Sequence, residues 1–113
     1  MTAETEMLDD DLVYLEKTRD SIYFNRLTFA SALLSTGGAI ETCLAVARRQ
    51  VKNAIAVIRP PGHHAEHDTA MGFCLFNNVP VAARVCQNVL GDQCRKIMIL
   101  DWCVCSGSGN CMT

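Results

Sequence analysis

The chain has 113 residues, half of them apolar, and carries a formal net charge of −2 at neutral pH. This length and composition indicate at most one domain with enough apolar side chains for a core. The small net charge argues against nucleic-acid binding through bulk electrostatics. Because neither a secretory leader nor a run of about 18 apolar residues is visible, we expect a protein that is neither secreted nor membrane-spanning.

The cysteines and the distribution of acidic residues indicate the compartment and the character of the N-terminal segment. The seven cysteines form an odd number and several lie in apolar or helical contexts, which is typical of free thiols in a reducing compartment. We therefore expect the protein in the nucleus and/or the cytoplasm. Residues 1–20 contain seven acidic and two basic residues. We expect 1–19 to be a flexible acidic lead-in, because short polar termini are usually poorly ordered.

Two helices are predicted in the first half of the chain. A short one is expected from Asp9 to Lys17, and a long one from Thr28 to about Gln50. Two neighbouring glycines, Gly37 and Gly38, cost the long helix about 1 kcal/mol each in propensity. They indicate either close packing against another element or a break into two helices. Apolar residues recur at helical spacing and predict the buried stripe Phe29, Leu33, Gly37, Ile40, Leu44, Ala47 and Val51.

Two apolar runs with a helix between them predict a βαβ unit. Ala54–Ile58 and Ile97–Leu100 have the pattern of buried strands. The helix between them can be capped by Asn77 or Asn78 and ends at Gly91. The fold class is therefore α/β, with the two strands parallel and their carboxyl ends at one edge. The expected buried stripe of this helix is Val79, Ala82, Ala83, Cys86 and Leu90.

The segment RPPGHHAEHDTAMGF, residues 59–73, follows the first predicted strand. Its two prolines remove two backbone donors and its first glycine permits a sharp turn. His63 and His64 are thus placed past the carboxyl end of a strand, where ligands bind in open α/β sheets. Adjacent histidines can divide the roles of general base and acid. The same topology brings Asp101 close to both. The alternative is a surface loop that happens to contain histidines.

These motifs resemble the zinc-dependent histone deacetylase family, and the motif RPPGHHA is most similar to its class II branch. The resemblance rests on Arg59–Ala65, Gly72–Cys74, Phe76–Val79, Ile97–Trp102 and Asp20–Asn25. It implies that residues 20–102 are the N-terminal part of a truncated arginase/deacetylase-type fold, one βαβ unit of a parallel sheet with flanking helices. The activity it implies is hydrolysis of the amide of N-acetyl-lysine.

The resemblance also implies roles for individual residues. His63 and His64 would act as base and acid around an attacking water, and zinc would polarise the amide carbonyl. Asp101 would orient one histidine and help to hold a monovalent cation. Three residues would bind substrate: Phe73 as a wall of the lysine channel, Gly72 by allowing close packing of its loop, and Ser21 at the rim. For Phe73 the alternative is an ordinary core aromatic.

The same resemblance implies partners. Acetylated histone tails, or other proteins that carry acetyl-lysine, would be substrates. A corepressor-type protein complex would be the setting, and transcription repression the outcome. Direct contact with nucleic acid or with a membrane is not expected.

The family pattern breaks after Trp102. Where the family reads Asp-Trp-Asp-Val-His-His-Gly-Asn-Gly, this chain places Cys103 and Cys105 at two zinc-ligand positions. The family's further ligand and its tyrosine are expected beyond residue 113. We therefore expect a divergent Cys/Gly/Ser tail over 103–113, no bound zinc and no activity in this form. The alternatives are a catalytically dead deacetylase-like binding or regulatory module, and a small cysteine-zinc protein.

Overall fold

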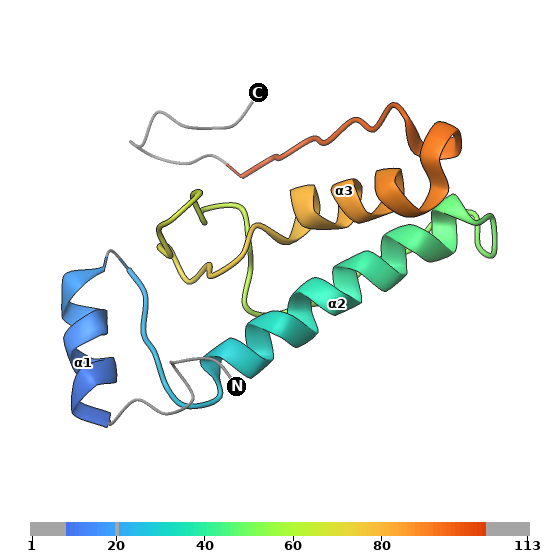
Figure 1. The fold of residues 1–113 in the computed structure, drawn as a ribbon. Coiled ribbons are helices and arrows are strands. Elements are labelled where there is room, and N and C mark those ends of the chain that lie inside the picture. The colour runs from blue at the N-terminus through green and yellow to red at the C-terminus, as the bar shows by residue number, and fades with distance from the viewer. Residues whose placement is uncertain (1–8, 20, 104–113) are drawn as a thin grey trace.

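The computed structural model describes residues 9–19 and 21–103. In chain order the elements are α1 (Asp9–Thr18), α2 (Thr28–Ala47), α3 (Asn78–Leu90) and the short 3-10 helix η2 (Gly91–Cys94). Helix α2 packs along α3, and α1 lies near the N-terminal end of α2 (Figure 1). The segment that joins α2 to α3 turns back along α2, where Ile58 lies against Gly38, and contains the histidine pair. The predicted helices are confirmed.

Helix α2 runs through the glycine pair without a break. A Cβ added to Gly38 would lie 3.2 Å from the Ile58 Cγ2 atom, whereas one added to Gly37 would meet nothing within 4 Å. The close-packing interpretation is therefore correct, and it applies to Gly38. The helix ends at Ala47, three residues before the predicted end. Arg49 adopts a positive φ of 60°, which a continuing right-handed helix does not allow.

The buried face of α2 differs from the predicted stripe. Of the predicted residues only Leu44 is buried, and Leu33 is 53% exposed. The face turned inward contains small and hydroxyl side chains, namely Ala32, Ser35, Thr36 and Ala39. Small residues allow α3 to approach closely, so packing rather than apolar size selects the face. On α3 the prediction is correct for Ala82 and Cys86 but wrong for the half-exposed Val79.

The predicted strands do not form a sheet in the described part of the chain. The one β-contact there is an isolated bridge between Met71 and Cys74. Side chains of both apolar runs face outward, with Ile55 88%, Val57 95% and Met98 89% exposed. The segment after η2 runs back along α3 as an extended trace (Figure 1). The parallel sheet therefore stays a prediction, while the helical layer beside it is observed.

Helix α2 also bears on the expectation that no segment spans a membrane. By length and composition alone, its 20 residues could cross one. The core helix of a soluble protein has the same properties, so this is weak evidence. Helix α2 packs on α3 and buries two hydroxyl side chains, Ser35 and Thr36, against it.

We predict that the 113-residue chain self-associates through its two apolar runs. Extended segments with unpaired backbone groups and apolar side chains are templates for intermolecular pairing. Lysines at such edges oppose pairing, so Val57→Lys combined with Met98→Lys should lower the apparent mass at a given concentration. Sedimentation velocity over a concentration series measures this. The control is Gln93→Lys at another exposed position. A concentration-independent monomer for the unsubstituted chain would contradict the prediction.

Candidate active site

The histidine turn is held tightly against the start of α3. The Ala65 N–H donates to the Gly62 carbonyl at 3.1 Å and closes the turn. A Cβ added to Gly62 would lie 2.5 Å from the Asn78 backbone nitrogen and 2.7 Å from the Phe76 carbonyl oxygen. Real Cβ atoms do not come so close to backbone atoms. Position 62 therefore requires glycine, because only a residue without a Cβ lets the turn lie this close to the start of α3.

The structure brings three predicted site residues together. His63 Nδ1 lies 2.9 Å from Asp101 Oδ2, across 38 residues of sequence. The His63 and His64 rings lie side by side, with centroids 4.1 Å apart and planes inclined by 57°. The other oxygen of Asp101, Oδ1, accepts a 2.9 Å hydrogen bond from the Cys103 backbone N–H. The proximity expected from the topology is thus present, although no sheet forms in the described residues.

These contacts favour the ionised form of Asp101. The hydrogen bond from the Cys103 backbone N–H, followed by that from His63, holds the pKa of the Asp101 carboxyl below its ordinary value. The carboxylate is therefore ionised at neutral pH, and an ionised carboxylate only accepts hydrogen bonds. The proton between the two side chains then belongs to His63 Nδ1. In the neutral imidazole, Nε2 is the nitrogen that can take up a proton.

Gly72 lies directly against the second histidine. Its φ is 55°, a left-handed conformation that disfavours side chains. A Cβ at this position would lie 2.7 Å from His64 Cδ2, inside the ring's van der Waals surface. Close packing of this loop, expected from the resemblance, is therefore observed, and its partner is the His64 imidazole.

Two further predicted residues, Ser21 and Phe73, are linked through their backbones. The Phe73 N–H donates to the Ser21 carbonyl at 2.9 Å, and both residues have positive φ, 63° and 50°. The Phe73 ring meets Tyr23 edge-to-face with centroids 6.4 Å apart. Phe73 is 52% exposed, so the core-aromatic alternative is wrong. An exposed aromatic held by strained backbone suits a channel wall, although this role stays a prediction.

Cys74 belongs to the same loop, but sequence reasoning treated it only as a free thiol. Its side chain is fully buried and its Sγ donates to the Gly72 carbonyl at 3.3 Å. Burial raises the pKa of this thiol, while the backbone N–H groups of His64 and Ala65 act in the opposite direction. The thiol therefore stays protonated and packs beneath the histidine turn. The sequence shows the motif Gly-Phe-Cys, but its cysteine was not predicted to be a buried packing residue of the loop.

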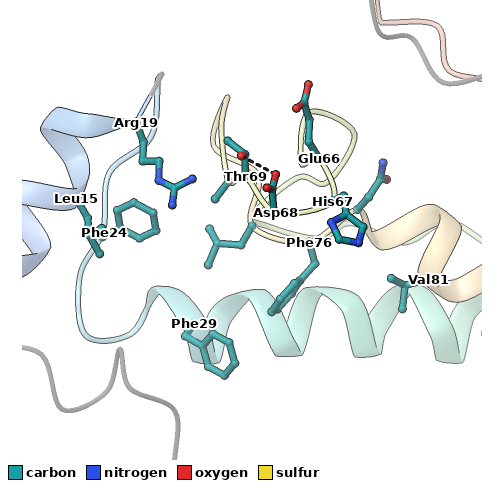
Figure 2. A pocket seen from close by; sticks show the side chains of 13 residues that line it. Leu15, Arg19, Phe24, Phe29, Glu66, His67, Asp68, Thr69, Phe76 and Val81 are labelled. Atoms are coloured by element: carbon teal, nitrogen blue, oxygen red, sulfur yellow. Dashed lines mark hydrogen bonds between the residues drawn. The ribbon is translucent and has the colours of Figure 1, made fainter.

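A separate hollow of about 510 Å³ lies between α1, the start of α2 and the loop (Figure 2). Arg19 and the ring of Phe24 reach into it from one side, while Phe76 and His67 line the other. The loop wall is shaped by its own contacts, because the Glu66 N–H donates to the Thr69 carbonyl at 3.0 Å. None of the predicted site residues lines this hollow, so this hollow is not the predicted channel.

The described donor residues do not make up a zinc site. Within 9–19 and 21–103, no group of three or more His, Cys, Asp or Glu residues could hold a metal ion. A catalytic zinc needs three protein ligands. Cys103 is exposed and contacts Asp101 through its backbone, while Cys105 lies outside the described residues. The predicted monovalent cation near Asp101 stays a prediction.

Comparison with known proteins gives one consistent result. A family model for the histone deacetylase domain matches residues 1–111. The chain is 48% identical over 112 residues to histone deacetylase clr3 of Schizosaccharomyces pombe, which covers 99% of this chain and 16% of that protein. It is 50% identical over 104 residues to histone deacetylase HDA1 of Saccharomyces cerevisiae, 92% of this chain and 15% of the relative. It is 42% identical over 110 residues to the polyamine deacetylase HDAC10 of Rattus norvegicus, 96% and 18%. The chain therefore spans about a sixth of the length of these relatives, and it belongs to the histone deacetylase family.

Proposed function

We propose that this chain is part of a class II-type lysine deacetylase and carries the general-base half of its active site. The observation that carries the proposal is the 2.9 Å contact between His63 and Asp101, with the tilted ring of His64 beside that of His63. The identity of 48% and 50% to two fungal histone deacetylases supports the same reaction class. The proposed substrates are acetylated histone tails or other proteins with acetyl-lysine, in the nucleus and/or the cytoplasm.

The reaction is hydrolysis of an amide. Water adds to the acetyl carbonyl, the C–N bond breaks, and acetate and the lysine amine leave. One histidine of the pair takes a proton from the water, and a proton is delivered to the departing nitrogen. An ionised Asp101 beside His63 stabilises the imidazolium that forms when Nε2 accepts that proton. The exposed ring of Phe73, whose backbone N–H donates to the Ser21 carbonyl, would line the path of the lysine side chain.

Zinc is the cofactor that the family uses, and it would polarise the carbonyl when bound. The residues of this chain do not fit that site, because Cys103 and Cys105 stand at two ligand positions and no third ligand gathers with Cys103 in the described part of the chain. We therefore propose that the 113-residue chain is inactive. The same substitutions favour a second candidate function, a catalytically dead module that binds acetyl-lysine proteins or joins a corepressor-type complex.

We predict no deacetylation by this chain. Without the metal ligands, the histidine pair alone lacks the group that polarises the amide. The measurement is release of acetate from an acetyl-lysine peptide with added Zn²⁺, against a blank of metal and peptide. The prediction fails if turnover exceeds the blank and is abolished by His64→Ala.

A second prediction concerns the ligand positions themselves. Cys103→Asp combined with Cys105→His supplies two of the family's zinc ligands, but a catalytic site needs three. We expect no increase in zinc affinity over the unsubstituted chain, whose thiols set the background. Competition with a chromophoric zinc chelator measures this. Tight one-to-one binding by the double variant would show that another residue completes the site.

A further inference from the structure

A buried polar cluster lies beneath the histidine loop. The Ser35 hydroxyl donates to the Pro60 carbonyl at 2.7 Å, and the Asn78 side-chain amide donates to the same carbonyl at 3.2 Å. The Asn78 amide also donates to Ser35 Oγ at 3.0 Å, while the Thr36 hydroxyl donates to Asn78 Oδ1 at 2.7 Å. All three residues are buried: Ser35 is 3% exposed, Thr36 9% and Asn78 3%. Among the described residues no buried side-chain polar atom lacks a partner.

Burying three polar side chains together is not an obvious gain in stability, so the cluster calls for an explanation. Burying a hydroxyl or amide costs free energy that a hydrogen bond only offsets, and apolar residues of similar shape could fill the space as well. Two donors of the cluster, the Ser35 hydroxyl and the Asn78 amide, converge on one loop atom, the Pro60 carbonyl oxygen. The Thr36 hydroxyl bonds Asn78 and also lies 3.0 Å from the Ala32 carbonyl oxygen of its own helix. The two prolines of this loop have no N–H, so the backbone cannot donate a hydrogen bond at these two positions. Side chains from α2 and α3 hold its carbonyl instead.

The cluster reaches the histidines through a short rigid path. Pro60 is three residues before His63, and Gly62 between them lies against Asn78, with 3.1 Å between its added Cβ and Asn78 Cγ. The same side chain thus bonds the carbonyl at the start of the turn and forms the wall against which the turn rests. A change at Asn78 therefore shifts His63 relative to Asp101, which lies on a different segment.

We propose that Ser35, Thr36 and Asn78 are positioning residues, which act through the Pro60 carbonyl to hold His63 within hydrogen-bond distance of Asp101. The proposal deepens the proposed function and rests on it for its catalytic meaning. The positioning itself is a property of the fold. It can be measured without any acetylated substrate, so its failure is distinct from failure of the deacetylase proposal.

The decisive variant is Asn78→Asp. It keeps the shape of the side chain and its acceptor for Thr36, but it removes the amide donor to Ser35 and to the Pro60 carbonyl. A carboxylate oxygen would then face that carbonyl oxygen, which repels it. The loop should move away and lengthen the contact between His63 and Asp101. The matched control is Asn77→Asp, because Asn77 is the neighbouring residue, sits at the N-cap of α3 and makes no side-chain capping hydrogen bond.

The readout is the titration of the Asp101 carboxyl, followed by carbon NMR on the full chain below the concentration at which it associates. The pKa of this group is lowered first by the Cys103 N–H and then by the His63 hydrogen bond. Loss of the second contact is therefore expected to raise the titration midpoint of the Asp101 carboxyl. His63→Ala gives the full size of the rise. We expect Asn78→Asp to reproduce that rise, and Asn77→Asp to leave the midpoint unchanged.

A check on folding separates positioning from general damage. The Cys86 thiol is buried between α2 and α3, so its slow reaction with a thiol reagent reports an intact helical layer. A raised Asp101 midpoint with Cys86 still protected supports the proposal, and an unchanged midpoint in Asn78→Asp overturns it. If Asn78→Asp exposes Cys86, Ser35→Ala decides, because it removes one donor to the Pro60 carbonyl and leaves the amide in place. A smaller rise supports the proposal, and no rise overturns it.

Discussion

The site depends on how a chain segment without backbone donors is kept in place. Pro60 and Pro61 precede the histidine turn, and neither can donate a hydrogen bond. The segment before them forms no ladder in the described structure, so sheet hydrogen bonds do not hold the loop there. At the proline pair it is the Pro60 carbonyl that is held, because it accepts from Ser35 and Asn78. The helical layer thereby determines where the histidines lie, and glycine at position 62 allows the backbone to come close enough.

The interface between α2 and α3 is packed and hydrogen-bonded, whereas the two apolar runs are exposed. Apart from Leu44, the buried residues of α2 and α3 are small or polar, and every described buried polar side-chain atom is partnered. On the other side, Val57 and Met98 are almost fully exposed. The loop lies between these two parts and is bonded to the first. This explains how the His63–Asp101 contact can form although the sheet predicted around it is not present in the described residues.

Prediction from the sequence was most successful where a residue type constrains the backbone in one way, as proline and glycine do. Prolines and a glycine after an apolar run predicted the loop, and topology predicted that Asp101 would lie near it. It was weaker on α2, because apolar periodicity selects large side chains while the observed contact uses Ala32, Ala39 and two hydroxyls. Asn77 or Asn78 was expected at the helix cap. Asn77 occupies that position without a side-chain capping hydrogen bond, and Asn78 turns inward. A buried amide with donor and acceptor both engaged has no signature in a single sequence.

Cys103 shows why the base and the metal-binding halves of such a site can be separated. Its contact with Asp101 is made by the backbone N–H, which every residue except proline provides. This hydrogen bond to Asp101, which favours its ionised form, is therefore available whatever the side chain at position 103. An aspartate-to-cysteine change there alters the donor offered to a metal and leaves the orientation of the histidine intact. A chain with this substitution can keep the geometry of the base while losing the chemistry that would use it. A module that retains the loop, the exposed Phe73 and the histidine pair is physically consistent for that reason.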